Sequence, residues 1–253
     1  MSTTPRNHTV LVTGASQGIG FATSQLLLER GFRVILLAAD RTQLATAKSK
    51  LVRRGFAGDA IELAPIDLAN ARAIANRVPK LQLLQNGLFG LVNNAAVQVL
   101  KPLTDFSLED LESMWRVNMR APVLMLQACY PFLRAASGSV VNIGSISDRG
   151  HHAAYSIYGA SKCFLNGFSL HAARELGFDG IRINVISPGG VNTPLMRKVE
   201  RRVPRSQRAR LMKSIPIEQR WAMSEEIAEA IYFCLTGPGY LHGADVRVHG
   251  GVE

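Results

Sequence analysis

The sequence predicts an α/β protein in three layers, with helices on both faces of a doubly wound parallel β-sheet. Short apolar runs rich in Val, Ile and Leu alternate along the chain with longer segments of helical periodicity. Strands that alternate with helices pair in parallel through right-handed crossovers. No repeat, low-complexity segment or linker interrupts the pattern. We therefore expect one domain over residues 1–253, with an insertion at about 190–216 where the alternation stops.

Helices are expected in the gaps between the strands. Ile19–Arg30 and Thr42–Arg54 each run into a glycine, a residue that commonly follows the C-terminus of a helix. Ser107 opens a further helix with a variant of the capping box, Pro122 is expected to break or kink that helix, and Ser224 is expected to cap the last one. The expected strands are Thr9–Val12, Arg33–Ala38, Ile61–Pro65, Leu88–Val92, Ser139–Ile143, Arg182–Ile186 and Asp245–Val248.

The composition, with 47% hydrophobic and 19% charged residues, is that of a globular protein. No apolar run approaches the roughly 18 residues of a membrane helix. The N-terminal segment also lacks the apolar stretch of a signal peptide, so we expect a cytoplasmic location. The cysteines lie far apart in apolar helical contexts, which predicts buried thiols and no metal site. They are Cys129, Cys163 and Cys234.

The formal net charge of +10 is unevenly distributed. Between Met196 and Lys213 the chain carries eight basic residues against one acidic residue, Glu200. Such a cluster attracts anionic partners, although a solvated helical face is the alternative interpretation. The basic residues are Arg197, Lys198, Arg201, Arg202, Arg205, Arg208, Arg210 and Lys213.

A glycine-rich loop joins the first strand to the first helix over Val10–Gly20. Gly14 permits a tight turn, Gly18 lets the backbone approach a pyrophosphate, and Gly20 permits close packing of the helix. The N-terminus of the helix offers unpaired N–H groups and a partial positive charge to phosphates. Glycines near a turn often mark only a turn, but the strand–loop–helix context predicts a dinucleotide-binding site.

Tyr158 and Lys162 stand four residues apart in a helical pattern, and so they share a helix face. A cation beside a phenol stabilises the phenolate and is expected to lower the pKa of Tyr158 toward neutrality, where it serves as a general acid or base. An exposed helix pair is the alternative. Ser145, thirteen residues before Tyr158 at the end of a strand, favours catalysis, whereas the competing phenol of Tyr155 has no lysine four residues later.

These features together resemble the short-chain dehydrogenase/reductase family over nearly the full chain, beginning with the spacing Thr13-Gly-x3-Gly-Ile-Gly. The resemblance implies a Rossmann-like fold, an oxidoreductase that interconverts a ketone and a secondary alcohol with NAD(P)(H), and a homo-oligomer, either tetramer or dimer. It makes Tyr158 the acid/base, and it places Lys162 on Tyr158 and on the nicotinamide ribose. Ser145 then orients the substrate oxygen and stabilises charge on it, while Ser147 is a rival by type but not by spacing.

The same resemblance assigns further residues by motif. Asn93–Ala96 is similar to the family's Asn-Asn-Ala-Gly motif, with alanine in place of the glycine. Asn118 falls where the family has an asparagine that positions a water on a proton relay ending at the lysine. Asp67 with Leu68 resembles a pair that contacts adenine. A helix cap is the alternative role for Asp67, and an ordinary polar helix residue is the alternative for Asn118.

The segment Pro188–Pro194 resembles the stretch that covers the nicotinamide in this family, with Val191 and Thr193 contacting the carboxamide and the phosphates. The alternative is an ordinary Pro-Gly turn. The catalytic set implied by the resemblance is Asn118, Ser145, Tyr158 and Lys162. The implied cofactor-binding set is Gly14, Ser16, Gln17, Gly18, Ile19, Gly20, Arg41, Asp67, Leu68, Asn94, Ala95, Tyr158, Lys162, Pro188, Gly189, Val191 and Thr193.

The end of the second strand usually decides between NAD and NADP, because an acid there binds the ribose 2′-hydroxyl and repels a 2′-phosphate. That position holds Ala38, followed by Ala39, and Asp40 falls where such a residue often caps the next helix. Arg41 is within reach of a 2′-phosphate, although Gln17 stands where some NADP enzymes carry a basic residue. We favour NADP(H) over NAD(H), with Asp40 as a ribose ligand for NAD as the alternative.

The stretch after the Pro-Gly motif usually forms a substrate lid in this family, and here Leu195–Pro216 carries the basic cluster. The cluster favours a 3-oxoacyl-thioester reductase that docks an acidic acyl carrier protein, or the phosphates of coenzyme A, at residues 197–213. One alternative is a dehydrogenase/reductase of a free small alcohol or ketone. Another is a non-catalytic nucleotide-binding or nucleic-acid-binding scaffold, which has no need of Ser145, Tyr158 and Lys162. We expect neither nucleic acid nor membrane as a partner.

Overall fold

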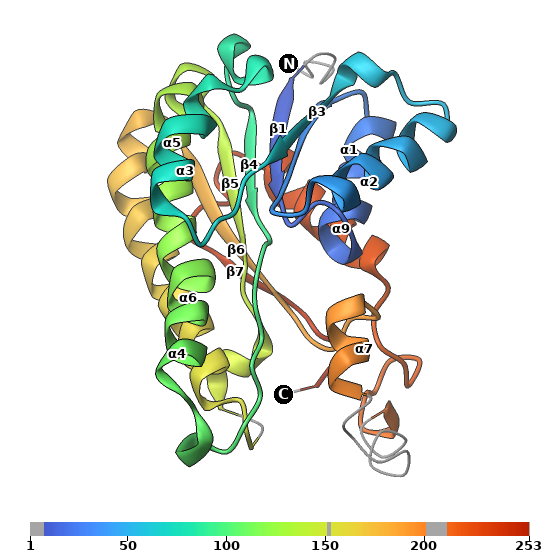
Figure 1. Ribbon diagram of the computed structural model, residues 1–253, viewed down its shortest axis with the longest axis vertical. Coiled ribbons are helices and arrows are strands. Elements are labelled where there is room, and N and C mark those ends of the chain that lie inside the picture. The colour runs from blue at the N-terminus through green and yellow to red at the C-terminus, as the bar shows by residue number, and fades with distance from the viewer. Residues whose placement is uncertain (1–7, 151–152, 201–211, 253) are drawn as a thin grey trace.

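The computed structural model describes residues 8–150, 153–200 and 212–252, and it confirms the doubly wound α/β fold (Figure 1). Seven parallel strands form one sheet in the order β3-β2-β1-β4-β5-β6-β7. Four strands match the expected segments, and the other three differ by one or two residues: β1 ends one residue later, β4 begins two residues later and ends one later, and β6 ends two residues later. They are β1 Thr9–Thr13, β2 Arg33–Ala38, β3 Ile61–Pro65, β4 Gly90–Asn93, β5 Ser139–Ile143, β6 Arg182–Pro188 and β7 Asp245–Val248.

Helices cover both faces of the sheet (Figure 1). On one face lie α3, α5 and α6, and on the other lie α1, α2 and α9. Within the described ranges, no helix is both long and apolar enough to cross a membrane. The helices are α1 Gly18–Glu29, α2 Arg41–Arg53, α3 Ala71–Arg77, α4 Leu108–Met114, α5 Ala121–Ala135, α6 Ser156–Leu176, α7 Pro194–Glu200 and α9 Ser224–Thr236.

The strands are buried on both faces because their side chains alternate between two apolar clusters. In β1, Leu11 packs into the cluster under α5 and α6, whereas Val10 and Val12 pack into the cluster under α1 and α9. All three side chains are fully buried. Burying a polar side chain in these strands therefore destabilises the fold unless the side chain has a hydrogen-bond partner inside the protein.

The expected break at Pro122 takes the form of a π-helical segment. The helix that opens with the capping box at Ser107 passes through Trp115–Arg120, which is π-helical, and continues as α5 with Pro122 in its first turn. Proline is tolerated there because the first turn of a helix needs no N–H donor. As Pro122 has no N–H, the carbonyl of Asn118 lacks the donor that an α-helix would supply four residues later.

Two local expectations are wrong. Ser224 is the first residue of α9 rather than its cap, because Met223 holds the cap position and its N–H donates to the Glu226 carboxylate at 2.6 Å. Cys163 is exposed, although Cys129 and Cys234 are buried as expected. An apolar neighbourhood in sequence does not decide which face of a helix a residue occupies.

A chain of buried polar side chains fastens α6 to the centre of the sheet. Asn93 Nδ2 on β4 donates to Asn142 Oδ1 on β5 at 2.8 Å, and Asn142 Nδ2 donates to Ser169 Oγ on α6 at 2.7 Å. Ser169 Oγ in turn donates to the Leu165 carbonyl at 2.6 Å. Each of these buried polar groups has a hydrogen-bond partner. The three linked hydrogen bonds therefore hold α6 over β4 and β5.

The topology places a crevice at the point where the strand order reverses. The chain winds outward from β1 through β2 to β3, and then returns to β4 on the other side of β1. The loops that leave β1 and β4 therefore diverge at the carboxyl edge of the sheet. Ligands of open α/β sheets bind at such a switch point, so the loops at this edge are where a site is expected.

Candidate active site

The predicted site residues gather on the loops that leave the carboxyl ends of the strands. Asn118 and the Tyr158–Lys162 pair reach the same edge from the π-helical segment and from α6. The loop after β1 and the first turn of α1 hold Gly14, Ser16, Gln17, Gly18, Ile19 and Gly20. The loops after the next three strands contribute Arg41 after β2, Asp67 and Leu68 after β3, and Asn94 and Ala95 after β4. Ser145 follows β5, and the end of β6 and the segment beyond it hold Pro188, Gly189, Val191 and Thr193.

Thr13 and Asn94 lock the glycine loop to the end of β4. Thr13 Oγ1 donates to the Val92 carbonyl at 3.2 Å and accepts from the backbone N–H groups of Asn94 and Ala95 at 2.9 and 3.0 Å. The Asn94 side chain returns the contact, since Nδ2 donates to the Thr13 carbonyl at 2.8 Å. The loops on the two sides of the switch point are thus held at a defined separation.

The glycine loop adopts backbone conformations and close contacts that favour glycine. Gly14 has a φ of +64° and Gly18 a φ of +56°, conformations that favour glycine. A Cβ on Gly20 would lie 2.5 Å from the Gly14 carbonyl oxygen, so only glycine lets α1 start this close to the loop. In the described structure the side chain of Gln17 at the N-cap makes no capping bond, which leaves the first N–H groups of α1 for an anion.

Tyr158 and Lys162 are buried on the face of α6 that meets the sheet. Lys162 Nζ donates to the carbonyl of Ile143 at the end of β5, at 2.7 Å, and lies 5.7 Å from the centre of the Tyr158 ring. Gly159 makes this approach sterically possible, because a Cβ there would lie 2.5 Å from the Ser147 carbonyl oxygen. The helix therefore brings the phenol and the ammonium directly against the Ser145 turn.

Burial dominates the electrostatics of this pair. It raises the pKa of the Tyr158 phenol above its ordinary value, Tyr155 raises it further, and a hydrogen bond with Ser145 lowers it. Burial also lowers the pKa of Lys162 to about 8. The expected lowering of the Tyr158 pKa is therefore wrong for the protein alone, because burial in a low dielectric disfavours the charged phenolate.

Ser145 caps the short 3₁₀ turn Ile146–Arg149 that follows β5. Its Oγ accepts from the Ser147 N–H at 3.1 Å and donates to Ser147 Oγ at 3.1 Å. Ser147 is buried, so the rival serine supports the turn from within. Ser145 is the hydroxyl that also contacts the Tyr158 phenol.

Asn118 uses its side chain to hold a neighbouring loop. Its Oδ1 accepts from the Val97 N–H at 2.9 Å, and its Nδ2 donates to the Val97 carbonyl at 2.8 Å and to Ser161 Oγ at 3.1 Å. Because these protein partners occupy the amide, the group of Asn118 suited to a water is its backbone carbonyl, which lies four residues before Pro122. The relay role remains a prediction.

Asp40 and Asp67, the two acidic residues considered as cofactor contacts, both accept hydrogen bonds from nearby backbone N–H groups. Asp40 caps α2, with Oδ1 accepting from the N–H groups of Thr42 and Gln43 at 2.8 and 3.0 Å. These bonds lower the pKa of Asp40. Asp67 Oδ1 accepts from the Ala69 N–H at 2.9 Å, while the cap of α3 is Asn70, so the helix-cap alternative for Asp67 does not hold.

The segment after β6 closes against the glycine loop. Gly189 N–H donates to the Val248 carbonyl at 3.0 Å, and Val191 forms a parallel bridge with Ala222. A Cβ on Gly18 would lie 3.3 Å from Thr193 Cγ2, so this segment and the loop after β1 are in contact. Five arginines of the predicted basic lid, at positions 201–210, lie outside the described residues.

Sequence reasoning missed two residues on which this geometry depends, Thr13 and Gly159. Both residues lie inside recognised motifs, but each acts through contacts with a segment that is distant in the sequence. Thr13 was visible only as the residue before the first glycine, and Gly159 only as the residue after the tyrosine. A glycine inside a helix costs stability, so its presence beside Tyr158 was the signal that something packs closely there.

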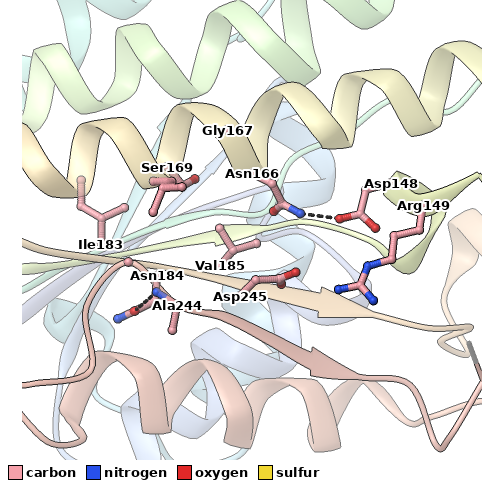
Figure 2. A pocket seen from close by; sticks show the side chains of 12 residues that line it. Asp148, Arg149, Asn166, Gly167, Ser169, Ile183, Asn184, Val185, Ala244 and Asp245 are labelled. Carbon is pink, nitrogen blue, oxygen red and sulfur yellow. Dashed lines mark hydrogen bonds between the residues drawn. The ribbon is translucent and has the colours of Figure 1, made fainter.

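A cavity of about 300 Å³ lies beside this site, between α6 and the strands β6 and β7 (Figure 2). Its polar lining includes Asp148 from the Ser145 turn, Asn166 from α6 and Asp245 from β7. This cavity was not predictable from the sequence, because its walls come from four separate segments of the chain.

A doubly wound sheet with a glycine loop at its switch point, and a serine, tyrosine and lysine together at the same edge, defines the class of nicotinamide-dependent oxidoreductases. A family model described as short chain dehydrogenase matches residues 8–204. The chain belongs to this family. It is a short-chain NAD(P)-dependent dehydrogenase/reductase.

Relatives and solved structures agree with this membership. Protein FixR of Bradyrhizobium diazoefficiens is 33% identical over 96% of this chain and 85% of its own length. A short chain dehydrogenase from Burkholderia cenocepacia in complex with NADP has a TM-score of 0.86 and 27% identity, with 98% and 99% of the two chains covered. A 3-oxoacyl (acyl-carrier-protein) reductase from Agrobacterium tumefaciens with NADP bound has a TM-score of 0.88 and 26% identity, covering 98% and 95%.

Gly20→Ala is expected to weaken NADPH binding by about tenfold or more, since about 1.4 kcal/mol of strain corresponds to a factor of ten. The new Cβ would lie 2.5 Å from the Gly14 oxygen and 2.6 Å from Asn94 Nδ2, so the loop must shift. Fluorescence titration with NADPH measures the effect. The control is Gly167→Ala on α6, where an added Cβ meets nothing within 4 Å in the described structure. Equal affinities for both variants would contradict the prediction.

Lys162→Met is expected to change how stability depends on pH. Burial lowers the pKa of Lys162 from 10.5 to about 8, so between these values the unfolded chain binds more protons than the folded one. The wild type should therefore gain stability relative to Lys162→Met as the pH rises through this window, with no change below it. Urea unfolding at several pH values measures this difference. Lys50→Met removes an exposed amine from α2 as a control, and an equal pH dependence in both variants would refute the prediction.

Proposed function

We propose that the protein is an NADP(H)-dependent reductase in which Tyr158, Lys162 and Ser145 act together on a carbonyl group. The observation that carries the proposal is the buried Tyr158–Lys162 pair, pressed against the Ser145 turn beside the glycine loop. This arrangement puts a proton donor, a cation and a hydroxyl at the edge of the sheet that also carries the glycine loop. A nucleotide scaffold needs a glycine loop but gains nothing from burying a lysine at the cost of its solvation.

Each side chain has a role that follows from its surroundings. When bound, the nicotinamide supplies the hydride for reduction or accepts it in oxidation. Tyr158 donates its proton to the developing alkoxide, and its raised pKa keeps it protonated until then. Lys162, fixed by the Ile143 carbonyl, is positioned to hold Tyr158 and the nicotinamide ribose. Ser145 orients the carbonyl and stabilises the charge on its oxygen.

The cofactor-binding residues predicted from the sequence fit this function. The loop Gly14–Gly20 would hold the pyrophosphate, Asp67 and Leu68 the adenine, and Asn94 and Ala95 would support the ribose side. Pro188, Gly189, Val191 and Thr193 would cover the nicotinamide. The contact between Thr193 and Gly18 supports this placement, since it brings the cover against the phosphate loop.

The end of β2 supports the proposed preference for NADP(H). Asp40 directs its carboxylate to the backbone of α2 and to Gln43 Nε2, at 2.9 Å, so it is committed to the cap. Arg41 is exposed at the first position of α2. An exposed guanidinium beside a strand end that carries Ala38 and Ala39 suits a 2′-phosphate. Two similar structures, from Burkholderia and Agrobacterium, contain NADP.

We propose a 3-oxoacyl thioester as the substrate, carried by an acyl carrier protein or coenzyme A, with a homodimer or homotetramer as the working form. The similar reductase from Agrobacterium and the basic segment 197–213 support this choice. A free small ketone is the second candidate. The roles proposed for Ser145 and Tyr158 involve only the carbonyl group, and they do not require the substrate to be attached to a carrier. Residues 190–216 are proposed as the substrate lid.

Arg41→Ala is expected to raise the KM for NADPH by about 10- to 100-fold and to leave the KM for NADH nearly unchanged, because a charge-assisted contact to the 2′-phosphate is lost. Steady-state rates with both reduced cofactors measure this. The matched control is Arg53→Ala, which removes an exposed guanidinium from the far end of α2. Wild-type preference for NADH, or an unchanged KM for NADPH in Arg41→Ala, would contradict NADP(H) preference.

Tyr158→Phe is expected to lower kcat by about 100- to 10,000-fold while NADPH still binds, because only the proton donor is removed. The assay follows nicotinamide absorbance over a panel of 3-oxoacyl thioesters and free ketones. Turnover of a carrier-protein substrate should fall as salt rises, whereas turnover of a free ketone should not. Intact turnover in Tyr158→Phe would refute the function, and activity confined to free ketones would favour the second candidate.

A further inference from the structure

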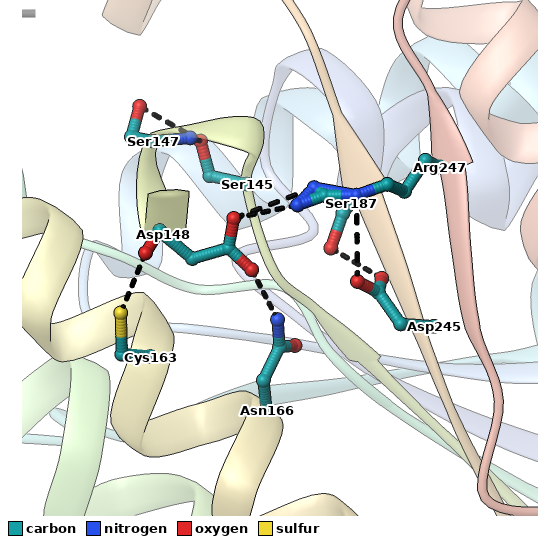
Figure 3. A network of polar contacts seen from close by, with 8 residues as sticks. All are labelled: Ser145, Ser147, Asp148, Cys163, Asn166, Ser187, Asp245 and Arg247. Carbon is teal, nitrogen blue, oxygen red and sulfur yellow. Dashed lines mark hydrogen bonds and ion pairs between the residues drawn. The ribbon is translucent and has the colours of Figure 1, made fainter. Parts of the chain in front are cut away.

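A buried ion pair joins the turn that follows Ser145 to β7 (Figure 3). Asp148 belongs to the turn that Ser145 caps, and Arg247 belongs to β7, ninety-nine residues later in the chain. Arg247 Nη2 donates to Asp148 Oδ1 at 2.7 Å, with Nη1 at 3.4 Å from the same oxygen. The side chains are only 12% and 8% exposed for Arg247 and Asp148, respectively.

The same aspartate is tied to the helix that carries Tyr158 and Lys162. Cys163 Sγ donates to the Asp148 carbonyl at 2.8 Å, and Asn166 Nδ2 donates to Asp148 Oδ2. Cys163 directly follows Lys162 in α6. Asp148 therefore joins the Ser145 turn to α6 through its backbone and through one carboxylate oxygen, while its other oxygen holds β7 (Figure 3).

A third set of contacts extends the network to the end of β6. Arg247 Nε lies 3.7 Å from Asp245 Oδ2, and Asp245 Oδ1 accepts from Ser187 Oγ at 2.5 Å. Asp245 and Arg247 share a face because side chains alternate along a strand, and Ser187 pairs with Arg247 in the β6–β7 register. Ser187 directly precedes Pro188, where the proposed nicotinamide cover begins.

The position of Ser145 is coupled mechanically to Asp148. The Asp148 N–H donates to the Ser145 carbonyl at 3.2 Å, and Ser147, between them, is bonded to Ser145 Oγ, so the turn moves as one unit. The cavity shown in Figure 2 adjoins Asp148, Asn166 and Asp245, and so apolar packing does not hold the turn on that side. Directed polar contacts are what remains to fix its position there.

We propose that Asp148 and Arg247 are positioning residues: their ion pair sets the Ser145 turn at its working distance from Tyr158 and from the end of β6. The inference rests on the proposed function and deepens it. Buried ion pairs are weak evidence for stability, because desolvation offsets much of the attraction. A role in geometry explains why the contacts of the pair reach α6 and, through Asp245, the end of β6, which both carry proposed site groups.

The test compares Asp148→Asn, Arg247→Met, Arg247→Lys and the double variant Asp148→Asn/Arg247→Met. We expect each neutralising single variant to lower kcat by about 10- to 100-fold, since small displacements of a catalytic group have effects of this size. The dissociation constant of NADPH should stay close to that of the wild type. Arg247→Lys, which keeps the charge, should recover part of kcat. The double variant should be no slower than the slower single variant, because both substitutions remove the same restraint.

The control is an ion pair remote from the site. Asp179 pairs with Arg134 at 3.3 Å and accepts from Tyr130 Oη at 3.0 Å, where α5 meets the turn after α6. Asp179→Asn should lower the melting temperature while leaving kcat unchanged. All kcat values are measured well below each variant's melting temperature, so that loss of folded protein does not count as loss of catalysis.

The outcomes separate this inference from the function on which it rests. Turnover by Tyr158→Phe at the wild-type rate would refute the proposed function and the inference with it. An inactive Tyr158→Phe together with wild-type kcat in Asp148→Asn and Arg247→Met would refute the positioning role alone. Rate losses that multiply in the double variant would also refute it, because the two residues would then act independently.

Discussion

The ammonium of Lys162 lies between α6 and the carboxyl end of β5, where its Nζ donates to the Ile143 carbonyl. Burying an ammonium costs free energy, and the lowered pKa of Lys162 records that cost. The contact is possible only because Gly159 lets α6 approach the Ser145 turn. Once this contact is made, the positions of Tyr158, of the turn and of the end of β5 relative to one another are determined.

The rest of the site is arranged around that contact by the sheet. Parallel strands deliver their carboxyl ends to one edge, and the reversal of strand order between β1 and β4 opens the crevice there. Thr13 and Asn94 hold the two diverging loops together by four hydrogen bonds, which keeps the phosphate loop in line with the chemistry beyond β5. The buried side chains of Asn93 and Asn142 link β4 and β5 to α6 by further hydrogen bonds. The site is thus a consequence of buried polar pairing at the sheet's edge.

Much of this was predictable from local pattern. Apolar runs located the strands, because burial on both faces leaves a composition that polar loops do not have. The glycine spacing and the four-residue interval between Tyr158 and Lys162 were readable since each depends on neighbours in sequence. The misses have a common cause. Cys163 was expected to be buried and proved exposed, and the pKa of Tyr158 was expected to fall and is raised, because burial depends on segments distant in the chain.

By itself, the sequence determined the order of strands and helices, the dinucleotide loop and the residue types that meet at the site, because backbone preference and periodicity act over a few residues. Only the tertiary structure decided what each side chain faces. It placed Asn118 on Val97, and Asp148 on an arginine from the last strand. Desolvation and long-range hydrogen bonding arise when remote segments pack together, and no local pattern in the chain encodes them.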